Sequence, residues 1–343
     1  MLNLHIGKNK MNILLTGGLG YIGSHVAVTL LNAGYDVVIV DNLVNSEIKT
    51  LNKIENITNK KVCFNEIDIR DDKKLNKVFE SNNLDAVIHL SGLKAVGESV
   101  LLPLDYYSSN VSGSINLFKI MKKHNVKKIV FSSSATVYGN PQYLPIDEDH
   151  PITAINPYGS TKIMIEDILL DLSNSDNDWS FISLRYFNPI GSHESAIIGD
   201  NPVGLPNNLM PFILKVHNGE IEHLRSFGND YNTSDGTGIR DYIHIEDLAK
   251  GHLDALEYIV NQEKVIDFIN LGTGKGSSVM EVLNAFETVS NKKIPFKIYP
   301  KREGDAESCY ADVKKAEKIL NWKSKHDLIS MCNSVYEYSK NIK

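Results

Sequence analysis

A tyrosine and a lysine four residues apart are the first pair of side chains in this sequence that could do chemistry. Tyr158 and Lys162 lie in the stretch NPYGSTK, where Pro157 opens a predicted helix. Their spacing places both side chains on one face, about one turn apart. A tyrosine with its ordinary pKa of about 10 is a poor base, but a nearby ammonium favours the phenolate and lowers that pKa. The pair predicts an acid–base group, although an ordinary helix-surface pair has the same spacing.

A run of small hydroxyl side chains strengthens this interpretation. Ser132, Ser133 and Ser134 end the apolar stretch that leads into FSSSATVYG. The carboxyl end of a parallel strand faces the crevice in which such sheets bind ligands. Ser134 can hydrogen-bond a substrate hydroxyl and relay its proton to Tyr158, whereas the plain alternative is a strand exit with satisfied hydroxyls. Ser134, Tyr158 and Lys162 are therefore the predicted catalytic residues.

A glycine-rich turn near the start of the chain predicts a binding site for a dinucleotide. In NILLTGGLGYIGSH, Gly18, Gly20 and Gly23 satisfy G-x-G-x-x-G, and Gly17 with the last two satisfies G-x-x-G-x-x-G. A strand precedes the turn, a helix follows it, and Asp41 ends the next strand. Glycines let the backbone approach a pyrophosphate at the helix N-terminus, and the acid accepts ribose hydroxyls. Asp41 would repel a 2′-phosphate, which favours NAD over NADP. The alternative is an ordinary β–α turn with a surface aspartate.

Short apolar strands that alternate with amphipathic helices must position these residues. Continuous apolar strands between helices indicate a parallel sheet covered on both faces, a doubly wound Rossmann α/β fold. The expected strands are the stretches NILLTG, DVVIVD, KVCFNEIDI, DAVIHLSG, KKIVFSSS and FISLRYFN, and the expected helices include YIGSHVAVTLLNAG and LDYYSSNVSGSINLFKIMKKHN.

The second half of the chain predicts a smaller mixed α/β lobe that binds the substrate. Residues 189–240 are rich in Gly, Pro, Asn and Asp with little periodicity, and such a long irregular region is usually functional. The stretches RDYIHIEDLAKGHLDALEYIV and IDFINLGTG return to strand and helix patterns, and we expect them to rejoin the sheet. The expected division is a cofactor domain over 11–188 plus about 241–275, and a substrate lobe over 189–240 and 276–343.

The overall composition excludes several classes of function. The 343 residues carry a net charge of −6 without a dense basic stripe, so we expect no nucleic-acid partner. Cys63, Cys309 and Cys332 are far apart, and the eleven histidines show no metal-ligand spacing, so we expect a reducing cytoplasm, no disulfide and no metal. No apolar run is long enough to span a membrane. The first ten residues lack the apolar core of a signal peptide and are interpreted as a dispensable extension before Met11.

The chain resembles the extended short-chain dehydrogenases/reductases and, within them, the UDP-glucose 4-epimerase family, from Met11 onward. The glycine turn marks only the superfamily, whereas GLKAVGES and FGNDYNTSDGTGIRDYIH are much narrower. The resemblance rests on the stretches TGGLGYIGSH, VDNLVNS, GLKAVGESV, FSSSATVYG, NPYGSTK, LRYFNPIGSH, PNNLMPF, FGNDYNTSDGTGIRDYIH and REGD.

The resemblance implies a redox-neutral reaction on a UDP-hexose with NAD that stays bound. NAD takes a hydride from C4 of the sugar while Tyr158 removes the O4 proton, with Ser134 assisting. Lys162 tunes the tyrosine and holds the nicotinamide ribose. The 4-keto sugar then turns over in the site and receives the hydride on its opposite face, so one acid–base group serves both faces.

The resemblance also implies which residues surround the cofactor. Lys94, just past the fourth strand, would supply a positive charge for the pyrophosphate, although a solvated loop lysine is the ordinary alternative. Ser109 stands where many of these enzymes have asparagine, directly before Asn110. The implied set is Gly17, Gly20, Tyr21, Ile22, Gly23, Asp41, Asn42, Asn45, Ser46, Asp68, Ile69, Lys94, Tyr158, Lys162 and Phe187.

The implied substrate site uses two arginines as a clamp. Arg240 and Arg302 can bind a pyrophosphate bidentately, and Asp305 can accept hydrogen bonds from the uridine ribose. The alternatives are an ion pair between Arg240 and Asp241, a solvated loop over residues 302–305 and, for a uracil-bordering Phe227, plain core. The implied set is Lys94, Ser134, Tyr158, Asn188, Asn208, Leu209, Phe227, Arg240, Arg302, Asp305 and Cys309.

Within this resemblance, Cys309 predicts a roomy sugar pocket. Some relatives have tyrosine at this position and others a small residue, which leaves space for a 2-acetamido group. We therefore expect turnover of UDP-GlcNAc and UDP-GalNAc as well. The alternative is a buried structural cysteine.

Two competing functions are disfavoured by particular residues. A 4,6-dehydratase on the same scaffold typically has an Asp–Glu pair just after the strand-end hydroxyls, where this chain has Ala135 and Thr136. A dinucleotide sensor without catalysis is disfavoured because the serine, tyrosine and lysine are all present. Relatives usually pair as homodimers through a four-helix bundle, for which the stretches near 102–124 and 157–172 could supply the faces.

Overall fold

The computed structural model describes residues 11–202, 204, 206–302 and 305–342. The expectation for the first ten residues, and positions 303 and 304 of the REGD stretch, lie outside this part of the chain. Within it, no helix combines the length and the apolar character that crossing a membrane requires.

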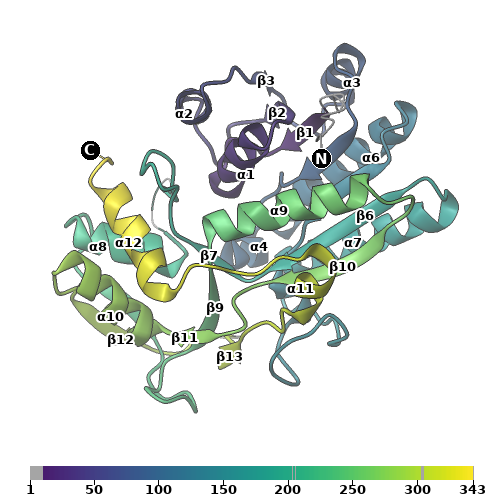
Figure 1. Cartoon of the computed structure of the whole chain (residues 1–343). Helices are drawn as coiled ribbons and strands as arrows, with labels where there is room; N and C mark the ends of the chain where they lie inside the picture. The colour runs from purple at the N-terminus through teal and green to yellow at the C-terminus, as the bar shows by residue number, and fades with distance from the viewer. Residues whose placement is uncertain (1–10, 203, 205, 303–304, 343) are drawn as a thin grey trace, which may run out of the picture.

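A seven-stranded parallel sheet forms the centre of the larger lobe (Figure 1). Every neighbouring pair of its strands is parallel, and the spatial order is β10-β6-β5-β4-β1-β2-β3. This order confirms the doubly wound α/β fold that the alternating pattern predicts. The strands are β1 (Asn12–Thr16), β2 (Asp36–Asp41), β3 (Cys63–Glu66), β4 (Ala86–His89), β5 (Lys128–Ser132), β6 (Ser180–Tyr186) and β10 (Ile266–Leu271).

Alternate residues of the central strands feed two separate cores, because successive side chains of a strand point to opposite faces. Ile13 and Leu15 belong to the core beneath α1 (Tyr21–Asn32) and α9 (Ile245–Val260). Leu14 belongs to the opposite core, together with residues of α3 (Asp72–Ser81), α6 (Gly113–Lys123) and α7 (Pro157–Ser175). Helix α2 (Lys49–Thr58) packs beside α1. Both faces of the sheet are therefore covered.

The stretch expected to be helical between β4 and β5 is helical from Pro103 to Lys123, although it is not one regular α-helix. The whole connection consists of α4 (Val96–Leu101), α5 (Pro103–Tyr106), the π-helical segment η1 (Tyr107–Ser112) and α6. Pro103 begins α5 because proline fits the first turn of a helix, where its missing N–H costs nothing. After β5, the short 3₁₀ helix η2 (Ala135–Tyr138) leads the chain away from the sheet edge.

The smaller lobe has two short sheets and its own apolar core, which includes Ile213, Phe286 and Met331. Figure 1 shows α12 beside α8 and α10, at the end of the molecule away from α3 and α6. The elements are β7 (Asn188–Ile190), α8 (Leu209–His217), β8 (Leu224–Phe227), β9 (Ile239–His244), β11 (Gly276–Ser278), α10 (Val279–Ser290), β12 (Phe296–Tyr299), β13 (Ser308–Cys309) and α12 (Leu328–Ser339). Helix α11 (Lys314–Leu320) instead packs against α9 and β10 of the larger lobe.

The expectation that the stretch beginning at Arg240 rejoins the large sheet is correct for α9 and β10 but wrong for β9. Strand β9 pairs with β7, β11 and β13 in the four-stranded sheet of the smaller lobe. A short apolar strand has the same pattern in either sheet, so periodicity alone could not distinguish the two sheets.

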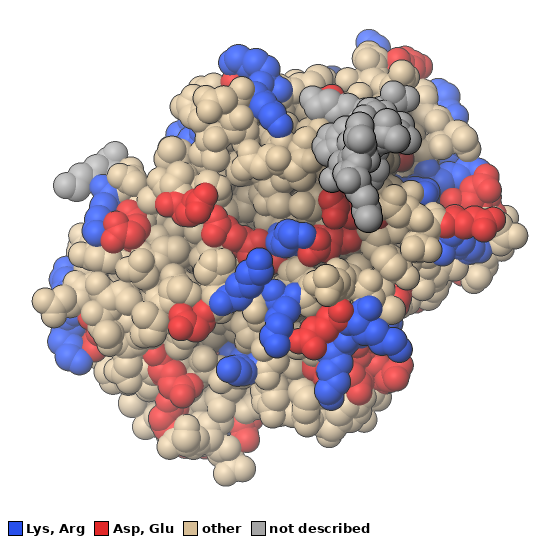
Figure 2. Space-filling view, viewed as in Figure 1, with Lys and Arg blue, Asp and Glu red and all other residues tan. Residues whose placement is uncertain are grey.

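On the face shown in Figure 2, basic and acidic side chains are interspersed across the middle of the molecule.

Candidate active site

The end of β5 and the start of α7 bring the three predicted catalytic side chains together. Ser134 is the N-cap of η2, and its Oγ accepts a 3.2 Å hydrogen bond from the N–H of Thr136. Tyr158 lies in the first turn of α7, which begins there because Asn156 caps it: Asn156 Oδ1 accepts a 2.8 Å hydrogen bond from the N–H of Gly159. The Ser134 hydroxyl hydrogen-bonds the Tyr158 phenol. The Ser134 and Tyr158 side chains are largely buried but keep a small solvent-accessible fraction. A ligand that binds at the sheet edge could reach them through it.

Lys162 lies beneath the tyrosine, one turn further along α7. Its Nζ donates a 2.8 Å hydrogen bond to the carbonyl oxygen of Ser132 and lies 5.7 Å from the centroid of the Tyr158 ring. The same nitrogen is 4.9 Å from the centroid of the Phe131 ring. The structure thus places a buried ammonium beside the phenol, as the spacing predicts.

Burial dominates the electrostatics of this pair. Removal from water raises the pKa of Tyr158 well above its ordinary value, and the hydrogen bond from Ser134 only partly opposes that rise. Removal from water also lowers the pKa of Lys162 to about 8. That Lys162 lowers the tyrosine pKa stays a prediction, because among the protein groups alone desolvation dominates and disfavours the charged form of both side chains.

The glycine turn has the shape that a pyrophosphate requires. Gly17 has a φ of +71°, and a Cβ there would lie 2.9 Å from the backbone nitrogen of Ser91. A Cβ on Gly23 would lie 2.1 Å from the carbonyl oxygen of Gly17, so this glycine lets α1 pack against the turn. Gly20 is the N-cap of α1 without a side-chain cap, and a Cβ there would meet only that carbonyl oxygen, at 3.4 Å. The first N–H groups of α1 therefore remain available to an anion, and the turn fits a dinucleotide.

Asp41 both ends β2 and fixes the glycine turn. One carboxylate oxygen accepts a 3.0 Å hydrogen bond from the N–H of Leu19, and the other accepts bonds from the N–H of Leu43 at 3.0 Å and the hydroxyl of Ser46 at 2.8 Å. The oxygen bonded by Leu19 has room for a further donor, so the predicted contact with ribose hydroxyls is compatible with this network. Asn45 is exposed in the loop that follows.

Asp68 and Ile69, two residues of the implied cofactor set, lie just after β3. Asp68 accepts a bidentate pair of hydrogen bonds from Arg70, and Asn42 donates to the same carboxylate at 3.1 Å. Hydrogen bonds from Arg70 lower the pKa of Asp68 to about 2, so this group is a carboxylate at neutral pH. Ile69 is buried beside it.

The remaining cofactor candidates lie on both sides of the sheet edge. Ile22 packs against the core under α1. The hydroxyl of Tyr21 donates a 2.8 Å hydrogen bond to the carbonyl oxygen of Gly191, which ties α1 to the smaller lobe. Phe187, directly after β6, is buried, and its N–H donates to the carbonyl oxygen of Leu271 at 3.1 Å.

The loop that carries Lys94 is held by a residue that the sequence argument passed over. The side chain of Asn110, in η1, accepts from the N–H of Leu93 at 2.8 Å and donates to its carbonyl oxygen at 3.0 Å. It also donates to Oγ1 of Thr161, on α7, at 3.0 Å. Ser109, at the position flagged by the resemblance, precedes it. The signal was present, because Tyr106, Asn110, Ser114 and Leu117 recur at helical spacing on one buried face.

Asp305 joins the two predicted clamp arginines. Its carboxylate lies 3.5 Å from Nη2 of Arg240 and accepts a 2.8 Å hydrogen bond from Nε of Arg302. The guanidinium of Arg302 lies 4.8 Å from the centroid of the Phe227 ring, and Cys309 pairs with Arg240 in the small sheet. The predicted substrate residues from three separate segments therefore form one cluster.

Asp241 has a structural role. It does not form the ion pair with Arg240 that the sequence left open as an alternative. Its carboxylate is buried and accepts hydrogen bonds from Thr273, Gly274 and Ala311. Arg240 is directed to Asp305 instead.

The last three predicted substrate residues line the start of the smaller lobe. Asn188 begins β7 and pairs with Tyr242, while Asn208 is the N-cap of α8, directly before Leu209. The Asn208 side chain hydrogen-bonds Asp200. Burial raises the pKa of Asp200, and the positive charge of Lys94 partly offsets that rise. Asp200 was missed by the sequence argument, because nothing in the surrounding irregular stretch marks it.

Comparisons with known proteins agree with this geometry. The family model described as GDP-mannose 4,6 dehydratase matches residues 14–335. The UDP-glucose 4-epimerase of Bacillus subtilis is 54% identical over 322 residues, which cover 94% of this chain and 95% of that protein. The crystal structure of the Bifidobacterium longum UDP-glucose 4-epimerase, in complex with NAD⁺ and UDP, is 48% identical with a TM-score of 0.94, over 97% of this chain and 99% of that one.

A third comparison concerns a relative whose name includes two sugars. The UDP-Glc/GlcNAc 4-epimerase of Campylobacter jejuni is 33% identical with a TM-score of 0.84, over 96% of this chain and 99% of that one. The fold and the site define a class of nucleotide-sugar enzymes, the extended short-chain dehydrogenases/reductases. The matching family model belongs to the same class. Within that class, the chain belongs to the UDP-glucose 4-epimerase family.

Proposed function

We propose that this chain interconverts UDP-glucose and UDP-galactose by inverting C4 of the hexose, with NAD as a resident cofactor. The observation that carries the proposal is the buried group of Ser134, Tyr158 and Lys162 at the sheet edge that also carries the glycine turn. The family, the full-length identity to UDP-glucose 4-epimerases and the NAD⁺ and UDP bound by the Bifidobacterium protein support it.

The catalytic roles follow from the positions of the side chains. NAD, when bound, supplies reversible hydride acceptance at C4. Tyr158 takes the proton of the C4 hydroxyl, and Ser134 bridges that hydroxyl to the phenol. Lys162 keeps a positive charge beneath the ring, which favours the phenolate. Because Tyr158 returns the proton after the 4-keto sugar has rotated, one residue serves both faces.

The binding roles are assigned to the two lobes separately. The glycine turn, Asp41 and the loop with Lys94 hold the cofactor, and the smaller lobe holds UDP. Arg240 and Arg302 bind the pyrophosphate of the substrate through charge-assisted hydrogen bonds, which keeps UDP fixed while the sugar turns over. The proposed division has β9 in the small sheet and α11 packed against the larger lobe.

Dehydration is disfavoured by the residues of η2. A dehydratase must remove water across C5 and C6, which requires an additional acid and base. Ala135 and Thr136 occupy the first turn after Ser134, and neither side chain titrates in the neutral range. The intact Ser134, Tyr158 and Lys162 likewise favour an enzyme over a dinucleotide sensor.

The small side chain at position 309 favours N-acetylated substrates as well. Cys309 lies beside Arg240 in the small sheet, on the strand that borders the pyrophosphate clamp. A cysteine leaves more space there than an aromatic residue, which fits a 2-acetamido group. The Campylobacter relative, named a UDP-Glc/GlcNAc 4-epimerase, gives this extension a precedent within the fold.

An exposed apolar patch favours a homodimer. Leu101 and Leu104 are each 80% exposed and Val100 is 60% exposed, on α4 and α5, and Met164 on the adjoining α7 is 42% exposed. Clusters of this kind on a water-facing surface usually mark an interface. A second copy of this chain is the proposed occupant, and the cytoplasm is the proposed compartment because Cys63, Cys309 and Cys332 are all free thiols.

Replacing Tyr158 with phenylalanine tests the proposed function directly. We expect turnover of UDP-galactose to fall by at least about a hundredfold, the usual contribution of a positioned acid–base group. NAD should still be released in stoichiometric amount when the variant is denatured, because the glycine turn is intact. Tyr143→Phe, at a 43% exposed tyrosine outside the site, is the matched control and should retain full activity. Full activity in Tyr158→Phe would refute the assigned role.

A further inference from the structure

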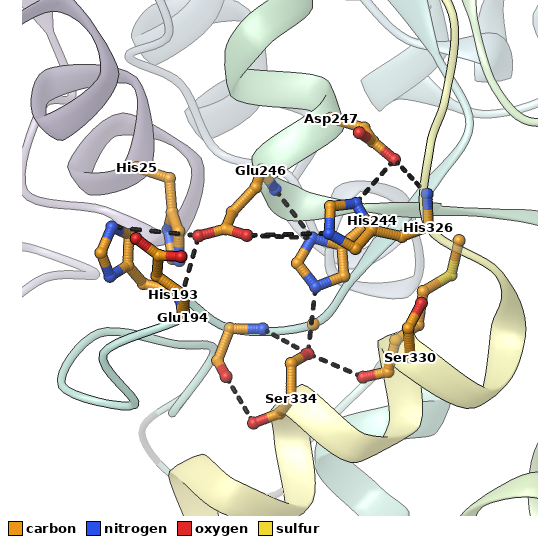
Figure 3. Close-up of polar contacts among 12 residues, drawn as sticks. His25, His193, Glu194, His244, Glu246, Asp247, His326, Ser330 and Ser334 are labelled. Atoms are coloured by element: carbon orange, nitrogen blue, oxygen red, sulfur yellow. Dashed lines mark hydrogen bonds and ion pairs between the residues drawn. The ribbon is translucent and has the colours of Figure 1, made fainter. Parts of the chain in front are cut away.

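Two histidines and a glutamate meet at the seam between the lobes, away from the substrate cluster. His244 ends β9, Glu246 lies in the first turn of α9, and His326 lies in the segment before α12 (Figure 3). Each offers one ligand atom, and these atoms lie within 4.8 Å of one another. Oε2 of Glu246 is 3.9 Å from Nδ1 of His244 and 4.0 Å from Nε2 of His326. These separations are too long for hydrogen bonds.

The hydrogen bonds around Ser334 fix the tautomer of His244. The Ser334 hydroxyl donates its proton to the carbonyl oxygen of Met331 at 2.8 Å, so it can only accept from Nε2 of His244, 3.1 Å away. His244 therefore carries its proton on Nε2 and keeps a lone pair on Nδ1, the nitrogen nearest Glu246.

Asp247 lies beside the second histidine. Its Oδ2 is 3.1 Å from Nδ1 of His326 and accepts hydrogen bonds from the backbone N–H groups of Lys325 and His326. Nδ1 itself makes no hydrogen bond within the described residues, and Nε2 of the same ring lies 4.0 Å from Oε2 of Glu246. A carboxylate behind the distal nitrogen of an imidazole is the usual outer partner of a metal-ligating histidine.

Glu246 presents one oxygen to the pair and uses the other elsewhere. Oε1 accepts a 3.0 Å hydrogen bond from the N–H of Glu194 and lies 3.9 Å from Nε2 of His193. Oε2 is thus directed to the two imidazoles, as Figure 3 shows. The two rings are stacked, with centroids 4.0 Å apart and planes at 21°. Two imidazoles and one carboxylate therefore bring three lone-pair donors close together, and one of the stacked rings has to rotate before both in-plane lone pairs point to one ion.

We propose that His244 Nδ1, Glu246 Oε2 and His326 Nε2 form a binding site for a divalent transition metal ion, of which Zn²⁺ fits best. Two neutral imidazoles and one carboxylate are a common zinc ligand set, with a fourth position for water. Tetrahedral zinc with ligand bonds of about 2.1 Å separates its ligands by roughly 3.4 Å. The 3.9 and 4.0 Å separations exceed this value by about half an ångström, and all three ligand atoms lie within 4.8 Å of one another, so binding requires the histidine rings to reorient.

Two features of the surroundings make binding feasible. Glu246 and His326 side chains are 28% and 33% exposed, so an ion can enter from solvent. Nδ1 of His244 accepts a 3.1 Å hydrogen bond from the N–H of Glu246, the N-cap contact of α9, and exchanges it for the metal bond. The loss of this single N-cap hydrogen bond is small beside the free energy that a structural zinc ion supplies.

Bound metal would fasten the segment before α12 to the strand that carries the pyrophosphate clamp. Arg240 and His244 lie on the same strand, β9, and His326 joins them from the far end of the chain. The sequence argument expected no metal site because it looked for short ligand spacing. His326 is separated from the other two ligands by the whole of α9, β10, α10 and α11, so no motif could reveal it.

Zinc binding to the tag-free, cofactor-loaded enzyme tests the proposal. After treatment with a chelator and dialysis, titration calorimetry with Zn²⁺ should show one site per chain, and Zn²⁺ should raise the melting temperature, because a ligand that binds only the folded state stabilises it. Glu246→Gln and His326→Gln should each weaken the affinity by at least about tenfold. Co²⁺ in place of Zn²⁺ should give the visible absorption of a four-coordinate site.

A matched control separates this site from adventitious binding. Cys63 is an exposed thiol and hence the obvious competing zinc ligand, so Cys63→Ser should leave the affinity unchanged. Wild-type enzyme that takes up no Zn²⁺ would overturn the proposal. So would an affinity that is unaffected in both Glu246→Gln and His326→Gln while each variant retains the melting temperature of the metal-free wild type.

Discussion

Nζ of Lys162 donates its hydrogen bond to the carbonyl oxygen of Ser132, the last residue of β5, at 2.8 Å. This bond anchors the ammonium at the carboxyl edge of the sheet, beneath the ring of Tyr158. The position is costly, since burial lowers the pKa of Lys162 to about 8. The active site therefore keeps a charge that folding alone disfavours, a common conflict between stability and activity.

Replacing Lys162 with methionine should reveal that cost as a pH dependence of stability. The ordinary pKa of lysine, about 10.4, applies to the unfolded chain, whereas the folded pKa is about 8. Between these values the unfolded state binds more protons, so wild-type stability falls as the pH is lowered from 10.5 to 8. Relative to Lys162→Met, the loss should be on the order of 2 kcal/mol, measured by denaturant unfolding at several pH values.

The comparison cancels the other titrating groups and the pH-independent loss of the bond to Ser132. Lys119→Met, at an exposed lysine on α6, should show no such divergence from wild type. A difference between wild type and Lys162→Met that stays constant from pH 10.5 to 8 would contradict the lowered pKa. The variant should also lose epimerase activity.

Conservative changes at the clamp arginines should weaken substrate binding without removing the cofactor. A lysine keeps the charge of Arg240 or Arg302 but cannot make the paired hydrogen bonds of a guanidinium. Since hydrogen bonds to charged groups contribute about 1.5–3 kcal/mol, Arg240→Lys and Arg302→Lys should each raise KM for UDP-galactose roughly tenfold to a hundredfold. Steady-state kinetics would measure this, with NAD content determined separately.

Arg225→Lys is the matched control for the clamp. Arg225 lies on β8, exposed, 5.7 Å from the Tyr299 ring centroid, and takes no part in the Asp305 cluster. Its KM should match wild type. A normal KM in Arg240→Lys and in Arg302→Lys would instead mean that these arginines serve only to hold Asp305.

Local spacing made the centre of the site predictable. Tyr158 and Lys162 share one helical turn, and the glycines of the turn lie between a strand and a helix that are adjacent in sequence, so period and turn chemistry were sufficient. The joining of Arg240 to Arg302 through Asp305 spans many elements, and only resemblance indicated it.

Features that depend on burial or on distant pairing were not predictable. The raised pKa of Tyr158 arises from desolvation, which the sequence does not record. Strand β9 has the same apolar pattern whichever sheet it joins, and Asp241 differs from a surface aspartate only by the backbone N–H groups that meet it. His326 is far from Glu246 in sequence and comes close to it only in the folded structure.

Charging the exposed apolar patch should dissociate the proposed dimer. Leu101 and Leu104 are each 80% exposed, so aspartate at both positions adds little strain to the protomer but places charges within the interface. We expect Leu101→Asp with Leu104→Asp to sediment as a monomer at micromolar concentration in analytical ultracentrifugation, where wild type sediments as a dimer.

Ile329→Asp provides the control for added charge. Ile329 is 47% exposed on α12, in the smaller lobe, and its replacement should leave the dimer intact. A wild-type protein that is monomeric, or a double variant that remains dimeric, would show that this patch has another partner.

Tyrosine at position 309 should separate the two substrate classes. Cys309 acts only through its volume, because burial raises the pKa of its thiol to about 11 and keeps it protonated at neutral pH. Overfilling a packed pocket costs about 1–3 kcal/mol, so Cys309→Tyr should reduce kcat/KM for UDP-GalNAc by roughly tenfold to a hundredfold. Turnover of UDP-galactose, which lacks the acetamido group, should change by no more than a few-fold.

Cys309→Ser distinguishes volume from thiol chemistry because it retains the small size and removes the sulfur. This variant should turn over both substrates at wild-type rates, and both rates are measured with the same coupled assay. Loss of UDP-GalNAc turnover in Cys309→Ser would assign a role to the thiol itself. Equal rates for the two substrates in Cys309→Tyr would place the acetamido group elsewhere, away from the strand that pairs with Arg240.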